Sequence, residues 1–190
     1  DVFLDTARRH GLLPFAAARL SSAAAALPGA LASELAHAVA ANTMRQAMLS
    51  EAMAELAERF SAAGVPHMPY KGLALAQLAY SSPDLRPSDD LDFLIPPAAI
   101  RPAFDAVLSL QRYTPYGPWT VGRDWKRNAR EGMVFADRTG RFWIDLKTSV
   151  SCAALGVTVN HEWVWSDTAR LVVGGRGVIT CSPRVYALAL

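Results

Sequence analysis

Two aspartates, Asp90 and Asp92, stand one residue apart at the start of an apolar run, and together they could hold a metal ion. In a strand, residues i and i+2 point to the same face, so the two carboxylates would project together while Leu91 and Phe93 point the other way. Adjacent carboxylates repel each other unless a cation lies between them or one carries a proton. Carboxylate oxygens are hard ligands that suit Mg²⁺. The spacing therefore predicts a magnesium site, against the alternative of a turn-capping aspartate followed by a solvated strand edge.

A lysine and a glycine, Lys71 and Gly72, lie between a short extended run at 65–70 and an apolar helical stretch at 73–80. A glycine before a helix lets the backbone approach a phosphate, and the helix N-terminus favours an anion. Lys71 would add a positive point charge. The alternative is a plain strand-to-helix turn with a solvated lysine. A phosphate cradle beside a carboxylate pair predicts metal-assisted phosphoryl or nucleotidyl transfer.

Several of these motifs together resemble one known family. They are Tyr70-Lys71-Gly72, the Leu-Ala-Leu-Ala stretch after it, Arg86-Pro87 and the Asp-Leu-Asp-Phe-Leu-Ile run at 90–95. They resemble the uncharacterised nucleotidyltransferase family of the DNA-polymerase-β-like superfamily, which has Lys-Gly where most relatives have Gly-Ser. The resemblance covers most of the chain. It implies an α/β (α+β) fold with a polymerase-β-like nucleotidyltransferase core. We expect a small mixed sheet, helices on one side of it, and an N-terminal helical region packed against it.

The resemblance also implies an activity and its cofactor. The chain would be a Mg²⁺-dependent nucleotidyltransferase, with two ions, that moves a nucleoside monophosphate from a nucleoside triphosphate to an acceptor. It places a third acid at Asp145, which would hold metal with Asp90 and Asp92 and lie near the attacking group. Pyrophosphate would leave toward Gly72 and Lys71. The acceptor stays open: a small molecule, a peptide, a protein or a tRNA.

Two further basic residues accompany the predicted site. Lys147 lies two residues after Asp145, where many relatives have histidine. It would neutralise phosphate charge or pair with Asp145. Arg86 precedes the carboxylate pair and would hold a phosphate or brace Asp90, against the alternative of a surface loop arginine. Both residues are therefore candidates for phosphate binding.

Two other function classes remain possible from the sequence. A catalytically inactive nucleotide- or partner-binding module would keep the fold, and the Lys-Gly departure favours it. A toxin-like RNA-modifying enzyme would need a basic surface for tRNA or another RNA. Four basic residues share one face if 122–130 is helical, since they follow i, i+3, i+4 and i+7 spacing. They are Arg123, Lys126, Arg127 and Arg130. The alternative is a solvated basic face.

Composition narrows the class of protein. With 52% hydrophobic and 19% charged residues, the 190-residue chain is not disordered. A net charge of +2 is too small to imply nucleic acid by itself. We expect a cytoplasmic protein without a membrane partner, because no apolar run approaches the roughly 18 to 20 residues of a membrane span and the N-terminus does not read as a signal peptide. Cys152 and Cys181 are expected as reduced thiols.

The sequence divides into three expected regions. Residues 1–63 form an N-terminal helical region, in which Pro14 leaves open whether 2–20 is one helix or two. Residues 64–181 form the nucleotidyltransferase-like domain, and 182–190 begin a C-terminal helix that we expect to continue beyond Leu190. Other expected elements are helices at 31–62 and 97–110, hairpins at 132–147 and 171–180, and loops at 113–118 and around Trp163.

Overall fold

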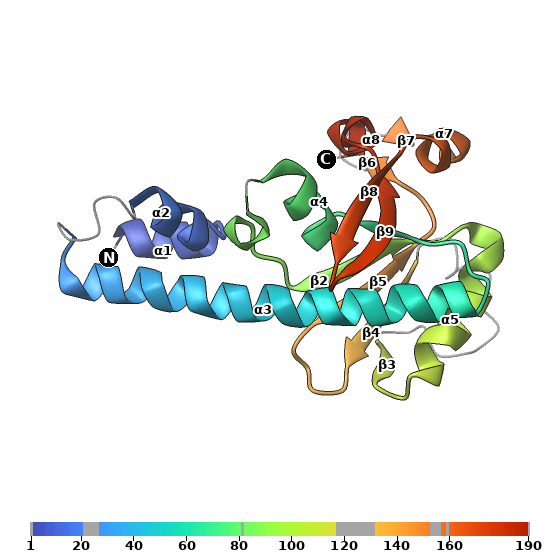
Figure 1. Ribbon diagram of the computed structural model, residues 1–190, viewed down its shortest axis with the longest axis horizontal. Helices are drawn as coiled ribbons and strands as arrows, with labels where there is room; N and C mark the ends of the chain where they lie inside the picture. Colours follow the sequence, from blue (N-terminus) through green and yellow to red (C-terminus); the bar gives the residue numbers. More distant parts are fainter. Residues whose placement is uncertain are drawn as a thin grey trace.

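One long helix, α3 (Gly29–Ala62), runs along almost the whole molecule (Figure 1). The computed structural model describes residues 2–20, 27–80, 82–116, 132–152, 157–158 and 160–189. Helices α1 (Val2–Arg9) and α2 (Leu13–Leu20) lie beside the N-terminal half of α3, and the sheet lies against its C-terminal half. The region 2–20 is therefore two helices. Pro14 stands in the first turn of α2, where proline is tolerated.

A five-stranded mixed sheet forms the centre of the α+β fold, which confirms the expected fold class. Its spatial order is β1 (Met68–Tyr70), β2 (Asp90–Leu94), β5 (Trp143–Lys147), β4 (Met133–Asp137) and β3 (Tyr113–Tyr116). Strands β2 and β5 run parallel, and the other neighbours are antiparallel. The parallel pair matters most for the site, because it brings two distant acidic segments into one register.

The two central strands alternate between an apolar face and a charged face. Leu91, Phe93, Ile144 and Leu146 are fully buried and pack in one cluster with side chains of α3, α4 (Gly72–Ala79) and α5 (Ile100–Ser109). The alternate residues of β2 and β5 point to the opposite face. Burial of the apolar half therefore determines which side chains point to the charged face.

The charged face is itself closed at one end by two short helices. Leu94, Met68 and Tyr70 pack in a second cluster with α7 (His161–Ser166) and α8 (Pro183–Ala189). Helices therefore contact both faces of the sheet, where the sequence predicted them on one side only. The reason is that Leu94, on the same face as Asp90 and Asp92, is apolar and is stabilised by burial under these helices.

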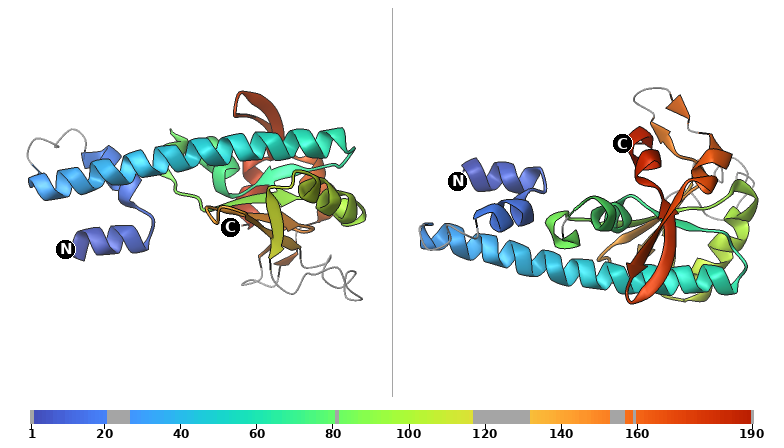
Figure 2. Two further views of the ribbon diagram at one scale, coloured as in Figure 1. Left: turned by 90° about the horizontal axis from the view of Figure 1, so that it is seen from below. Right: turned by 45° about the horizontal axis from the view of Figure 1, so that its top comes forward.

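Both expected hairpins are present. Strands β4 and β5 pair antiparallel, as do β8 (Thr168–Val173) and β9 (Arg176–Cys181). Figure 2 shows the second hairpin crossing α3. Its turn approaches the helix closely, because a Cβ on Gly174 would meet the Ser50 carbonyl oxygen and the Ala54 Cβ at 3.0 Å. Glycine at this position lets the hairpin dock on the helix.

Two expected loops are regular elements instead. Residues 113–116 form β3, an edge strand, and Pro115 is tolerated there because an edge strand has backbone groups outside the ladder. Residues 161–166 form α7, whose N-cap Asn160 accepts a hydrogen bond from the Trp163 amide at 3.0 Å. The remaining elements are η2 (Pro83–Leu85), η3 (Pro97–Ala99), β6 (Ser151–Cys152) and β7 (Val157–Thr158). Among the described helices, none combines the length and apolarity needed to cross a membrane.

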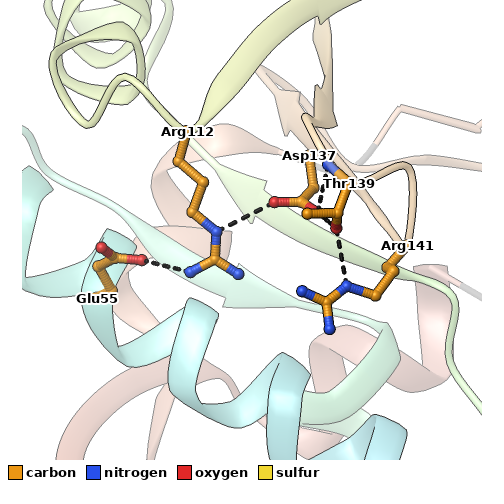
Figure 3. A network of polar contacts seen from close by, with 5 residues as sticks. All are labelled: Glu55, Arg112, Asp137, Thr139 and Arg141. Carbon is orange, nitrogen blue, oxygen red and sulfur yellow. Dashed lines mark hydrogen bonds and ion pairs between the residues drawn. The ribbon is translucent and has the colours of Figure 1, made fainter.

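A polar network joins the far edge of the sheet to α3 (Figure 3). Arg112 donates from Nε to Asp137 Oδ1 at 3.1 Å and from Nη1 to Glu55 Oε2 at 3.3 Å. The backbone N–H and the hydroxyl of Thr139 both donate to Asp137 Oδ2. Burial would raise the pKa of the Asp137 carboxyl, but the hydrogen bonds from Thr139 and Arg112 lower the pKa below its ordinary value. The ionised carboxylate therefore stabilises this end of the fold.

We expect Asp137→Asn to lower the free energy of unfolding by about 2 to 3 kcal/mol at pH 7, because an amide cannot accept all of these hydrogen bonds. The contribution of a carboxyl with a lowered pKa is present above about pH 4 and is lost as the pH falls through the folded-state pKa. Urea unfolding at pH 7 and pH 3 measures the difference. Asp105→Asn, in an exposed pair with Arg101, is the control and should change little. Equal losses at both pH values would contradict the role of the charge.

Candidate active site

The three predicted carboxylates share one face of the sheet. In the parallel register of β2 and β5, Asp92 lies opposite Asp145, and Asp90 lies opposite Trp143. Because Asp90 and Asp92 are two residues apart in the strand, all three side chains point to the charged face. The side chain of Asp92 is 5% exposed and that of Asp145 is 26% exposed. The register therefore brings together the acids that lie far apart in the sequence.

An ammonium group lies between two of these acids. Lys147 Nζ is 2.9 Å from Asp145 Oδ2 and 3.3 Å from Asp92 Oδ1. Burial lowers the pKa of Lys147, but the hydrogen bond to Asp145 and the charges of both carboxylates outweigh burial and leave the pKa raised. Lys147 thus pairs with Asp145, one of the two roles expected from the sequence, and with Asp92 as well.

The surroundings of Asp92 raise the pKa of its carboxyl. Burial, followed by repulsion from Asp90, raises the pKa of Asp92 to about 6; Asp145 adds to the increase and Lys147 opposes it. Among the described residues, Oδ1 of Asp92 is buried without a hydrogen-bond donor, although it has the ion pair to Lys147. The site therefore carries more negative charge than its own cation neutralises.

The Lys71-Gly72 turn lies against the carboxylate pair. Helix α4 begins at Gly72, whose φ is +35°. A Cβ on Gly72 would lie 2.8 Å from Ser88 Oγ and 3.4 Å from the Asp90 carbonyl oxygen. Ser88 Oγ in turn lies 3.4 Å from Asp90 Oδ1. The candidate phosphate turn and the candidate metal-binding acids are thus adjacent, and the missing side chain of glycine permits it.

The backbone of Lys71 is strained and is held from the C-terminal part of the chain. Its φ of 55° and ψ of −146° are rare for a residue with a side chain and cost about 1 to 3 kcal/mol. The Lys71 N–H donates to Tyr186 Oη at 3.1 Å. Thr180 Oγ1 donates to the Pro69 carbonyl, and Tyr186 Oη lies 2.9 Å from the same hydroxyl. Since Thr180 uses its proton on Pro69, Tyr186 donates to Thr180.

We expect Tyr186→Phe to destabilise the fold by about 1 to 2 kcal/mol, because it leaves the Lys71 N–H without its acceptor. The ring would remain stacked on Tyr70, with centroids 5.5 Å apart, so packing is preserved. Denaturant unfolding of the variant and of the wild type measures this loss. Tyr80→Phe, on a partly exposed ring, is the matched control. A loss no larger than that of Tyr80→Phe would contradict the bracing role.

Arg86 is anchored to the turn. Its Nη1 donates to the Gly72 carbonyl at 3.0 Å, so this contact braces the start of α4. The sequence had predicted Asp90 or a phosphate as the partner of Arg86. Two side chains of α3 hold the segment before the carboxylates. Gln46 Nε2 donates to the Arg86 carbonyl at 3.1 Å, and Asn42 Nδ2 donates to the Asp84 carbonyl. The long helix therefore helps to position the loop that leads into β2.

Sequence reasoning missed the residues that hold the site together. Asn42 and Gln46 had a detectable signal, because they continue the three- and four-residue spacing of the apolar stripe that includes Leu49 and Met53. A polar residue within such a stripe indicates a buried hydrogen bond. Other missed residues are Ser88, Thr180 and Tyr186.

The structure leaves the predicted basic face untested and shows no ready-made metal cluster among the described residues. The basic residues Arg123, Lys126, Arg127 and Arg130 lie outside the described residues, so the RNA-binding alternative stays a prediction. Within the described ranges, no group of three or more His, Cys, Asp or Glu side chains is arranged to hold a metal ion. The three acids share a face, but Lys147 stands between two of them.

Comparison with known proteins gives distant structural likenesses. No protein of curated function matches the sequence. The lincosamide antibiotic adenylyltransferase LnuA, with lincomycin bound, has a TM-score of 0.44 at 12% identity over 68% of this chain and 77% of its own. The antibiotic-resistance factor ANT(2'')-Ia has a TM-score of 0.47 at 14% identity over 72% of this chain and 66% of its own.

A third likeness is to an antigenic nucleotidyltransferase-like protein from Paracoccidioides brasiliensis, with a TM-score of 0.45 at 14% identity over 72% of this chain and 62% of its own. The match thus spans less than two thirds of the second and third structures. Likenesses this distant carry no residue roles to this chain. The sequence model of a family described as "Uncharacterised nucleotidyltransferase" matches residues 1–190. The chain belongs to this uncharacterised nucleotidyltransferase family.

Proposed function

We propose that the chain is a Mg²⁺-dependent nucleotidyltransferase that transfers a nucleoside monophosphate from a nucleoside triphosphate to an acceptor. The observation that carries the proposal is the placement of three carboxylates, Asp90, Asp92 and Asp145, on one sheet face against the glycine turn that begins α4. Family membership supports nucleotidyl transfer as the reaction. In this proposal residues 64–181 are the catalytic unit, 1–63 the helical region packed on it, and 182–190 a C-terminal segment that contains α8.

The donor set fits a hard divalent cation. Three carboxylates share one sheet face with a single ammonium, which pairs with two of them, and Asp92 Oδ1 has no hydrogen-bond donor among the described residues. Asp90, Asp92 and Asp145 would hold Mg²⁺, which would stabilise the charge that develops on the phosphate oxygens. Cytoplasmic location, where Mg²⁺ and nucleoside triphosphates are plentiful, is part of the proposal.

The protein's own groups have distinct parts in the reaction. The N-terminus of α4 at Gly72 would bind phosphate oxygens through its backbone N–H groups, and Lys71 supplies positive charge there. An acceptor oxygen attacks the α-phosphorus, the bond from that phosphorus to the β-phosphate oxygen breaks, and pyrophosphate leaves toward Gly72. Asp145, which is partly exposed, takes the proton of the acceptor. The acceptor is a small molecule, a peptide, a protein or a tRNA.

One observation favours a second candidate function. Lys147 fills the space between Asp92 and Asp145, and no described cluster is ready to hold a metal ion. A catalytically inactive nucleotide- or partner-binding module would tolerate this arrangement, because a bound nucleotide needs no turnover. Such a module would bind nucleotide without needing Mg²⁺ on the acids.

The test compares the thermal stability of the wild type and an Asp90→Asn, Asp92→Asn double variant with each nucleoside triphosphate, with and without Mg²⁺. Ligand at about 100 times its dissociation constant should stabilise the wild type by about 2.7 kcal/mol. Asp89→Asn is the control, because Asp89 is 83% exposed and pairs with Arg45.

A Mg²⁺-dependent shift lost only in the double variant supports the transferase, and pyrophosphate release with candidate acceptors then identifies the substrate. A Mg²⁺-independent shift kept in the double variant supports the binding module. No shift with any nucleotide overturns both the transferase and a nucleotide-binding module, and supports a partner-binding module instead.

A further inference from the structure

We propose that the Lys147 ammonium is a built-in cation of this site, which competes with a divalent ion for the Asp92–Asp145 pair. The inference rests on the proposed function for the identity of the site as a metal site, but the contacts of Lys147 do not depend on that function. Lys147 Nζ contacts one oxygen of each acid, at 2.9 Å for Asp145 and 3.3 Å for Asp92. A wild-type site built in this way binds one divalent ion fewer than the same site without the lysine, or binds the same number more weakly.

The position of the lysine is set by the sheet and not by a flexible loop. Lys147 is the last residue of β5, paired in register with Leu94. Its carbonyl accepts a hydrogen bond from the Ile95 N–H at 2.8 Å. On the other side, a Cβ on Gly132 would lie 3.5 Å from Lys147 Cα. The backbone is therefore fixed, and the side chain reaches back along its own face to the acids.

The other nearby cations have different partners. Lys71 Nζ lies over the Tyr70 ring, 5.2 Å from its centroid. Arg86 donates to the Gly72 carbonyl, and Arg45 pairs with Asp89. Among the ion pairs of the described residues, Lys147 is thus the cation that pairs with Asp92 and Asp145. A divalent ion entering between these two acids would meet a positive charge at close range, so one of the two cations must leave.

Manganese binding tests the proposal directly. The number of Mn²⁺ ions bound by the intact chain is measured by electron paramagnetic resonance titration, without nucleotide. We compare the wild type with Lys147→Met and Lys147→Gln. Glutamine is neutral but can still donate hydrogen bonds to the carboxylates, so Lys147→Gln keeps the test valid if Lys147→Met fails to fold. Lys71→Met is the matched control, because it removes a nearby positive charge that does not lie between the acids. Circular dichroism verifies that each variant is folded.

We expect each Lys147 variant to bind one more Mn²⁺ than the wild type, or to bind the same number at least tenfold more tightly, while Lys71→Met matches the wild type. Equal numbers and affinities within threefold for wild type and both Lys147 variants would overturn the inference. An equal gain in Lys71→Met would also overturn it, because any lost positive charge would then suffice. Binding of no ion by the wild type and one by the variants would support Lys147 as the built-in cation and count against Mg²⁺-dependent catalysis.

Discussion

Asp92→Asn should make the protein more stable at pH 7.5 and remove Mg²⁺-dependent nucleotide binding. The folded-state pKa of Asp92 is about 6, against a reference of 3.8, because burial and Asp90 disfavour its charge. The folded state therefore holds a proton more tightly than the unfolded chain, so this group makes stability fall as the pH rises from about 4 to about 6. Above that range the ionised carboxylate costs up to about 3 kcal/mol. Asparagine has the same shape without the charge.

Urea unfolding at pH 7.5 and pH 4 measures this effect. We expect the variant to exceed the wild type by about 1 to 3 kcal/mol at pH 7.5 and to match it near pH 4, where Asp92 is protonated. Asp89→Asn, at an exposed neighbour, should change neither stability nor nucleotide binding. A variant less stable than the wild type at pH 7.5 would mean that the ion pair with Lys147 outweighs the burial of Asp92. The expected outcome is typical of a functional site that is retained at the expense of stability.

Gly72→Ala should be the most damaging substitution in the turn. Its Cβ would meet Ser88 Oγ at 2.8 Å and the Asp90 carbonyl oxygen at 3.4 Å, and φ is already +35°. Strain and crowding together should cost about 2 to 4 kcal/mol and abolish nucleotide-dependent stabilisation. Gly64→Ala separates the two causes, because Gly64 has φ +65° but nothing within 4 Å of its Cβ position. It should cost only about 1 to 2 kcal/mol.

A double-mutant cycle with Gly72→Ala and Ser88→Ala tests how much of the lost stability comes from crowding against Ser88. Removing the Ser88 hydroxyl leaves 3.4 Å as the closest approach, so part of the lost stability should return. Denaturant unfolding of the four proteins gives the coupling free energy. Additive losses, or a Gly72→Ala loss equal to that of Gly64→Ala, would mean that the turn does not pack on the acids as closely as the distances indicate.

The sequence was sufficient for elements whose signals are local. The alternation through Asp90-Leu91-Asp92-Phe93 identified a strand with one charged face, and a glycine-containing turn at Gly140 identified the hairpin of β4 and β5. It failed for β3, because Pro115 reads as a turn residue unless the strand is known to be at an edge. Edge position is a property of the whole sheet and has no local signal.

The same distinction applies to the candidate site. Lys147 was placed on the face of Asp145 by the two-residue period of a strand, and the ion pair between them follows from that period. Its contact with Asp92 depends on the parallel pairing of β2 and β5, which no local pattern specifies. Tyr186 could not be assigned to the turn for the same reason, because its partner Lys71 is 115 residues away in the chain.

The bond between Lys71 and Tyr186 also has a consequence for the order of folding. Contacts between distant parts of a chain form late, because the intervening loop must close first. We therefore expect the local helices and the hairpin of β4 and β5 to form first. The strained turn at Lys71 acquires its geometry later, when β9 and α8 have docked on it. Local opening of α8 would release the turn while the sheet stays intact. Hydrogen exchange at the Lys71 amide should therefore follow the docking equilibrium of the C-terminal segment, and not the stability of the sheet.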